Sequence, residues 1–305
     1  MLRNTINNYV ELRRSLGFKF RIQNSLLQNF LAFAEKRGDT HIRNKTVIEW
    51  ANLGPSPAQK RNRLLTVRRL AIAMEPEDKR HEVPPYSAFC HRKSERRKPC
   101  ILSEDELKLL LTATLNIKSK STILPITYAT LFALLAATGL RVSEAISLNI
   151  KDIMEDGLMI RATKFKKDRL VPIHKTTRKG LHHYLKYRIQ WSSLNPSLFI
   201  SDKGNTLSYS TVNYIFLRLI RSIGLRGNAP NPGACLHDLR HRFAVRSIEQ
   251  CPIRNFTAIS QHMIALSTYL GHAHISDTYW YLQATPKLML QIAKAQEGFY
   301  KKERK

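Results

Sequence analysis

Residues 121–148 read STILPITYATLFALLAATGLRVSEAISL, and the first twenty of these positions carry no charge. A stretch of this length meets the length rule for a membrane span. The serine and threonine at its start, together with Pro125 and Tyr128, favour instead a helix buried in a protein core. Gly139 predicts the end of that helix. The sequence therefore places Arg141 at the interior edge of a domain built around this helix.

The segments on either side of this helix predict a mainly α fold with one small antiparallel β-sheet. Ser103, with Glu106 three residues later, matches a capping box and predicts a helix start. Residues 157–163 and 169–173 alternate like strands, and the lysine-rich KFKKD of residues 164–168 lies between them. Helices are also expected over 103–113, 142–148, 175–190, 209–223 and the remainder of the chain.

The N-terminal third predicts a separate helical domain. Apolar residues recur there at helical spacing in four segments, approximately 5–18, 22–38, 44–51 and 57–74. A Pro pair and a run of positive charge from His91 to Lys98 then predict a linker. This linker suits contact with a DNA backbone and is equally compatible with a flexible spacer. The expected division is a helical domain 1–82, a basic linker 83–101 and a second domain 102–305.

The charge balance points to a polyanionic partner. The chain has 50 Lys and Arg against 23 Asp and Glu, a net charge of +27 and a pI near 10.2. Nucleic acid is the leading candidate, and a ribosome-associated basic protein is the alternative. One helical segment combines apolar residues with five basic ones that we expect to contact DNA, although a solvated basic face is also compatible: Lys60, Arg61, Arg63, Arg68 and Arg69.

Compartment signals indicate a reducing environment. The four cysteines form no CxxC pair, and the N-terminus has no apolar signal core. We therefore expect a cytoplasmic, nucleoid-associated protein without a disulfide framework or a membrane anchor. Loops of the GxxxxGK[ST] or GxGxxG type do not occur in the sequence, so ATP and dinucleotides are not indicated.

Several residues suit phosphoryl transfer, which needs a nucleophile, cations around the phosphate oxygens and a proton donor. In HDLRH, His237, Arg240 and His241 share one face of a helix. Arginines from two segments can clamp one phosphate, whereas a structural salt bridge is the alternative for either. Tyr279 and Tyr281 are two residues apart, so on a helix only one of them faces a given site.

A zinc site is the competing interpretation of the same histidines. His237 and His241 have the i, i+4 spacing of zinc-binding helices. The glutamate of the HExxH motif is absent, however, and Arg240 between the two histidines would repel a cation. The sequence therefore predicts no metal site.

Three blocks, ATGLRVSEAISL (137–148), HDLRHRFA (237–244) and LGHAHISDTYWY (270–281), closely resemble the tyrosine recombinase (phage integrase) family. The helical N-terminal domain resembles that family's core-binding domain, so the resemblance covers nearly the whole chain. It implies a core-binding domain followed by a tyrosine-recombinase catalytic domain. Matched position by position, it implies the functional residues Arg141, Glu144, Lys164, His237, Arg240, His272 and Tyr281.

The lysine is the one position where the chain departs from the family pattern. The family has a turn of the form GKGxKxRxVPL, in which the lysine between the two glycines is catalytic. Here Thr163 and Phe165 replace both glycines around Lys164. This puts the shape of the turn in doubt and leaves Lys166 as a second candidate.

The resemblance also implies a mechanism. Tyr281 attacks the scissile phosphate, giving a 3′-phosphotyrosyl link and a free 5′-hydroxyl, while the two arginines stabilise the transition state. Lys164 protonates the leaving oxygen, His237 assists proton transfer from the tyrosine, and His272 hydrogen-bonds the phosphate. Glu144 supports the site without reacting. Because the covalent link conserves the phosphodiester energy, no ATP, metal or other cofactor is expected.

The same resemblance implies a homotetramer that holds two specific double-stranded DNA sites, with an accessory protein or a related recombinase as further partners. We expect the protein to serve a mobile element or replicon, by integration, excision, resolution or transposition. A C-terminal helix that contains Leu288 and Ile292 would pack on a neighbouring protomer or fold back on its own domain. A type IB topoisomerase-like relaxing enzyme and a non-catalytic DNA-binding regulator of the same fold are the alternatives.

Overall fold

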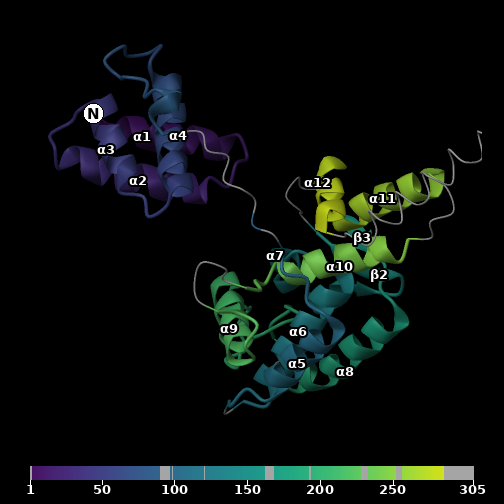
Figure 1. Cartoon of the computed structure of the whole chain (residues 1–305). Helices are drawn as coiled ribbons and strands as arrows, with labels where there is room; N and C mark the ends of the chain where they lie inside the picture. The colour runs from purple at the N-terminus through teal and green to yellow at the C-terminus, as the bar shows by residue number, and fades with distance from the viewer. Residues whose placement is uncertain are drawn as a thin grey trace, which may run out of the picture. The chain divides into compact units, whose positions relative to one another are not determined.

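The computed structural model describes residues 2–89, 97, 99–119, 121–161, 168–191, 194–227, 233–251 and 256–284, with the backbone alone at 256, 257, 283 and 284. The chain forms two compact units, residues 1–96 and 97–305 (Figure 1). The predicted mainly α fold with a small antiparallel sheet is confirmed. The division expected from the sequence, at 82/83 and 101/102, remains a prediction.

The N-terminal unit is a bundle of helices around one apolar core. Trp50 is central to it, because its ring packs edge to face on Phe30 at 5.3 Å and its Nε1 donates to the Asn29 side chain at 2.8 Å. Val83 and Phe89, from the start of the expected linker, pack against this core. The elements are α1 Leu2–Ser15, α2 Arg21–Glu35, α3 Asn44–Asn52, α4 Pro57–Met74 and the 3-10 helix η1 Tyr86–Ala88.

The second unit places one small sheet among helices. Its strands pair in the antiparallel order β1-β2-β3, with Ile160 opposite Arg169. Strand β1 was not predicted, since two residues are too few to show alternation. The helices are α5 Glu104–Leu115, α6 Ile123–Thr138, α7 Val142–Ile146, η2 Ile150–Asp152, α8 Lys175–Trp191, α9 Tyr209–Ser222, α10 Asp238–Glu249, α11 Phe256–Leu270, α12 Ser276–Tyr279 and η3 Trp280–Ala284. The strands are β1 Ile153–Met154, β2 Gly157–Ile160 and β3 Arg169–Val171.

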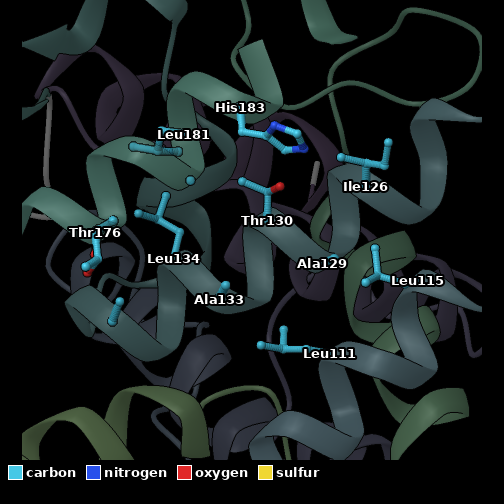
Figure 2. A pocket seen from close by; sticks show the side chains of 13 residues that line it. Leu111, Leu115, Ile126, Ala129, Thr130, Ala133, Leu134, Thr176, Leu181 and His183 are labelled. Atoms are coloured by element: carbon cyan, nitrogen blue, oxygen red, sulfur yellow. The ribbon is translucent and has the colours of Figure 1, made fainter. Parts of the chain in front are cut away.

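Helix α6 presents two different faces. Small side chains on one face, among them Ala129 and Ala133, line a groove of about 620 Å³ between α5, α6 and α8 (Figure 2). Leu111 and Leu115 of α5 form another wall of this groove, and Thr176 and His183 come from α8. The alanines on this face of α6 are too short to fill the space beside the neighbouring helices, and Ile126 and Leu134 of the same helix also line it.

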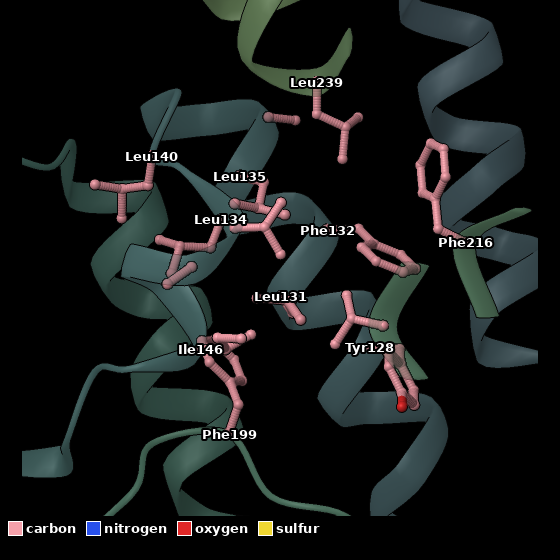
Figure 3. Packing of buried hydrophobic residues seen from close by; sticks show 14 of the residues in the cluster. Tyr128, Leu131, Phe132, Leu134, Leu135, Leu140, Ile146, Phe199, Phe216 and Leu239 are labelled. Carbon is pink, nitrogen blue, oxygen red and sulfur yellow. The ribbon is translucent and has the colours of Figure 1, made fainter. Parts of the chain in front are cut away.

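The opposite face of α6 carries large side chains that organise the core (Figure 3). Leu131 and Phe132 are fully buried, and the Phe132 ring packs edge to face on Phe216 of α9 at 5.5 Å. Leu239 of α10 belongs to the same core. The prediction that residues 121–140 hold a core helix is thereby confirmed. Among the described residues, no helix combines the length and apolar character needed to cross a membrane.

Gly139 ends α6 and connects the core to the candidate site. Its φ of 61° lies in the left-handed region, and its amide donates to the Leu135 carbonyl. Its own carbonyl accepts a 2.7 Å hydrogen bond from Arg240 Nη1. A Cβ at this position would lie 2.5 Å from Cδ1 of Phe243, so both the backbone angle and the packing require glycine.

We expect Gly139→Ala to lower the free energy of unfolding by about 2 kcal/mol or more, from left-handed strain plus overpacking against Phe243. Gly180→Ala is the matched control, because a Cβ on this helical glycine meets nothing within 4 Å. Gly180→Ala should raise the free energy of unfolding by about 0.5–1 kcal/mol. Urea unfolding followed by circular dichroism measures both. Equal destabilisation by the two variants would contradict the assigned role of Gly139.

Candidate active site

The start of α10 is fixed by a buried carboxylate. Asp238 is 1% exposed, and its Oδ2 accepts from the Cys235 amide and from Arg97 Nη2, each at 2.8 Å. These bonds hold the first turn of the helix, where His237 occupies the N-cap position. The ring centroids of His237 and His241 lie 4.6 Å apart, as expected for two residues on one helix face. Neither Arg97 nor Asp238 was predicted from the sequence to belong to the site.

Arg240 is the most deeply buried cation of the site, at 3% exposure. Its Nη1 donates to the Gly139 carbonyl, and its Nη2 donates to the Leu270 carbonyl at 2.9 Å and lies 2.9 Å from His272 Nε2. Burial lowers the pKa of Arg240, while a hydrogen bond and charge interaction with Tyr281 oppose that shift. Arg240 therefore joins the end of α6, the end of α11 and the predicted nucleophile.

Arg141, two residues after Gly139, lies in the same site as Arg240. Its Nη2 donates to the Gly271 carbonyl at 3.1 Å, next to the carbonyl that Arg240 uses. Its amide and its Nη1 donate to the two oxygens of Glu144 at 3.0 and 2.9 Å. The structure thus brings together the two arginines that the sequence predicts as a phosphate clamp.

Glu144 is held by a second arginine that the sequence analysis missed. Nη1 and Nη2 of Arg169 donate to its two oxygens at 3.1 and 2.9 Å, and Arg169 Nε donates to the Tyr269 carbonyl. Burial pushes the pKa of Glu144 up, but the hydrogen bonds from Arg169 and Arg141 outweigh it, so its pKa is lowered. The predicted supporting carboxylate is accordingly ionised and bridges α7 to strand β3.

Tyr281 is buried at 3% exposure, whereas Tyr279 is 47% exposed. This confirms that only one of the two tyrosines faces the site. The Tyr281 ring stacks near His272, with centroids 6.0 Å apart and planes at 21°, and meets His241 edge to face at 5.4 Å. The interior tyrosine is therefore the one nine residues after His272, as the family spacing implies.

The histidines of the site are surrounded by protein and positive charge. Burial, followed by Arg240 and Arg141, lowers the pKa of His272 to about 4. The His237 ring reaches solvent, yet the dense protein around it lowers its pKa, and the same two arginines add to the shift. Both imidazoles are therefore neutral at pH 7.

His241 was noted in the sequence but not assigned a role. Its ring lies between His237, Tyr281 and Trp280, and its buried Nδ1 has no hydrogen-bond partner among the described residues. Burial, followed by the charge of His237, lowers its pKa to about 4. A buried nitrogen without a partner favours a neutral ring that acts mainly through packing.

Some predicted residues lie outside the described part of the chain. These are Lys164 and the alternative Lys166, which follow β2 in the sequence, and the expected C-terminal helix with Leu288 and Ile292. Within the described residues, no group of three or more His, Cys, Asp and Glu residues is arranged to hold a metal ion.

The five basic residues of α4 predicted to contact DNA differ in their surroundings. Four of them contact polar atoms of the same unit, and Arg61 and Arg63 also lie over the rings of Tyr86 and Trp50. These four hydrogen bonds run from Lys60 to Asn52, from Arg61 to Tyr86, from Arg63 to the Trp50 carbonyl and from Arg68 to the Pro84 carbonyl.

Arg69 is different, because its side chain is exposed. It lines a pocket of about 270 Å³ together with Arg13 and Lys19, which the sequence analysis did not select. Arg13 also lies over the ring of Tyr9 at 5.0 Å. Three cations from α1, α4 and the α1–α2 connection therefore face one hollow of the N-terminal unit.

Comparison with known proteins gives a consistent family. Residues 101–287 match the sequence profile of the "Phage integrase family". "Putative integrase/recombinase y4rB" of Sinorhizobium fredii is 38% identical and covers 97% of this chain and 96% of its own length. "Tyrosine recombinase XerD" of Oceanobacillus iheyensis is 30% identical over 63% of this chain and 60% of its own length.

Solved structures share the fold. A XerH site-specific recombinase bound to its palindromic difH substrate aligns with a TM-score of 0.64 and 22% identity, over 90% of this chain and 78% of that one. A lambda integrase dimer bound to a COC′ core site aligns with a TM-score of 0.64 and 18% identity, over 92% and 76%.

The lowered histidine pKa values predict a loss of stability in acid. Between the ordinary pKa of 6.5 and the folded-state pKa of about 4, the unfolded chain binds more protons than the folded one. The free energy of unfolding should therefore fall as the pH drops through this window and level off above it. His241→Phe keeps an aromatic ring but cannot titrate. Its loss of unfolding free energy between pH 7.5 and 5 should therefore be smaller than that of the wild type by about 1–2 kcal/mol.

Urea unfolding at the two pH values measures this difference. His274→Phe, at an exposed position, is the control and should behave as the wild type. A loss in His241→Phe as large as that of the wild type would show that His241 does not contribute to the acid sensitivity.

Proposed function

The chain belongs to the phage integrase family of tyrosine-type site-specific recombinases, and we propose that it cleaves and rejoins DNA through a 3′-phosphotyrosyl intermediate on Tyr281. The burial of Tyr281 beside Arg240 and His272 is the observation that carries this proposal. Near-complete coverage of the integrase/recombinase relative favours strand exchange over DNA relaxation by a topoisomerase.

In the proposed reaction, the Tyr281 hydroxyl oxygen attacks phosphorus and the bond from phosphorus to the 5′-oxygen breaks. Arg141 and Arg240 supply guanidinium donors to the non-bridging oxygens, where negative charge develops. Both arginines donate to adjacent backbone carbonyls, at Gly271 and Leu270, so their guanidiniums already converge. Glu144 orients Arg141 through two hydrogen bonds and takes no part in proton transfer.

Two protons must move in each cleavage. Neutral His237 accepts the proton of Tyr281, and its lowered pKa keeps the ring available as a base. Lys164 gives a proton to the leaving 5′-oxygen, a role that rests on its match to the family's lysine position. Rejoining reverses both transfers, because a 5′-hydroxyl then attacks the phosphotyrosyl bond.

The substrate is double-stranded DNA carrying specific recombination sites. The XerH and lambda integrase structures hold such DNA, and one lambda integrase structure is a tetramer on a Holliday junction. We infer the same assembly here, four protomers on two sites, with a nucleoid-associated cytoplasmic location. The N-terminal unit adds phosphate contacts through Arg69 and its neighbours Arg13 and Lys19.

We expect a covalent protein–DNA adduct when the protein meets nicked DNA from the ends of the element or locus that carries its gene. Denaturing gels, run after incubation without ATP or added metal, measure it. Tyr281→Phe should abolish the adduct, because the attacking oxygen is gone. Tyr279→Phe is the matched control and should form the adduct at the wild-type rate, since that side chain is exposed.

An adduct lost in Tyr279→Phe and kept in Tyr281→Phe would contradict the nucleophile assignment. Tight, salt-sensitive binding without an adduct in any variant would favour the non-catalytic regulator. Lys164→Ala should slow adduct formation by about 10²- to 10⁴-fold while DNA affinity stays within a few fold, as expected for a lost general acid.

DNA affinity should depend on Arg69 more than on Arg68. Arg69→Gln should lower the slope of log K against log salt concentration by about 1, the change expected for one lost phosphate contact. Arg68→Gln is the matched neighbour and should leave the slope unchanged, because that guanidinium already donates to the Pro84 carbonyl. Fluorescence anisotropy titrations at several salt concentrations measure both. An unchanged slope in Arg69→Gln would remove Arg69 from the DNA interface.

A further inference from the structure

The His272 ring is held at both nitrogens. Nε2 lies 2.9 Å from Arg240 Nη2, and Nδ1 lies 2.7 Å from Thr278 Oγ1. Thr278 is fully buried and stands three residues before Tyr281, so its hydroxyl and the phenol ring share one helical face toward His272. Neither the sequence motifs nor the mechanism above assigns Thr278 a role.

The position of the ring proton follows from the chemistry of the partners. A guanidinium has only donors, so His272 Nε2 must accept from Arg240. The neutral imidazole therefore carries its proton on Nδ1 and donates it to Thr278 Oγ1. The lowered pKa of His272, caused first by burial and then by Arg240 and Arg141, keeps the ring in this neutral form at pH 7.

A bound phosphate needs the opposite arrangement. Its non-bridging oxygens only accept hydrogen bonds, so His272 must present Nε2–H to it, and Nδ1 then becomes an acceptor. Arg240 turns its donors to the phosphate in the same step. A buried Nδ1 without a donor would be costly, because a polar atom removed from water requires a partner.

We propose that Thr278 is a positioning residue that allows His272 to exchange its ring proton from Nδ1 to Nε2 when the scissile phosphate binds. A threonine hydroxyl accepts in the first arrangement and, after rotation, donates in the second. The proton leaves Nδ1 and reaches Nε2 through solvent, so the net charge of the ring does not change. This inference rests on the proposed function, since it assumes that His272 contacts the phosphate.

Two variants separate the hydroxyl from the packing. Thr278→Val keeps the shape and removes the hydroxyl, whereas Thr278→Ser keeps the hydroxyl and removes a methyl group. Thr278→Ala, which loses the hydroxyl without adding bulk, is the second test if the valine variant does not fold. Thermal unfolding of the full chain establishes that each variant is folded.

The first measurement does not depend on activity. Nitrogen-15 NMR of histidine-labelled full chain, recorded without and with bound DNA and with the His272 signals identified by their loss in His272→Gln, reports which ring nitrogen carries the proton. Without DNA, Arg240 holds Nε2 as an acceptor, so we expect the Nδ1–H tautomer in every variant. With nicked DNA bound, each in a Tyr281→Phe background that cannot react, we expect Nε2–H with the wild-type threonine and with Thr278→Ser, and no such change in Thr278→Val. A wild-type pattern in Thr278→Val would overturn the proposal, whether or not the protein recombines DNA.

The second measurement is single-turnover adduct formation on nicked DNA. Thr278→Val should be slower by about 10- to 100-fold with DNA affinity within twofold, while Thr278→Ser stays within about threefold of the wild type. Equal loss in both variants would indicate packing alone and overturn the proposal. If the wild type forms no adduct, the proposed function is wrong. The NMR result still tests whether Thr278 controls which ring nitrogen of His272 carries the proton.

Discussion

A single buried guanidinium organises the second unit of this protein. Arg240 is almost completely removed from water, so its donors must all find acceptors inside the fold. They find them on the Gly139 carbonyl, the Leu270 carbonyl and His272 Nε2, which belong to segments far apart in the sequence. Satisfying this one charge therefore fixes the end of α6, the end of α11 and the segment that carries the nucleophile.

The surrounding residues follow from the need to balance that charge. Glu144 is ionised between Arg141 and Arg169, while His237, His241 and His272 are held neutral by burial and nearby arginines. The described site is thus positive through its guanidiniums rather than its imidazoles. Such a site suits a phosphodiester, since arginine stabilises developing negative charge and a neutral histidine accepts a proton.

In the N-terminal unit, the basic residues that the sequence predicts to contact DNA differ in their surroundings, and their role at DNA remains a prediction. Four of the five α4 residues selected for charge donate a hydrogen bond to polar atoms of their own unit. Arg69 is exposed and shares a hollow with Arg13 and Lys19. The sequence of a helix alone cannot distinguish an arginine that contacts its own unit from an exposed one, because both lie on the polar face of the helix.

The sequence by itself determined the fold class, the core helix ending at Gly139, and the convergence of Arg141, Arg240, His272 and Tyr281. The first two follow from apolar periodicity and helix-end signals, whereas the site residues follow from the resemblance of three sequence blocks to the tyrosine recombinase family. Only the tertiary structure decided that Arg169 holds Glu144 and that Thr278 holds His272. The reason is physical. Arg169 and Glu144 are 25 residues apart, and several hydroxyls lie near His272 in the sequence, so three-dimensional packing selects the partner in each case. No periodic pattern in the sequence reports that selection.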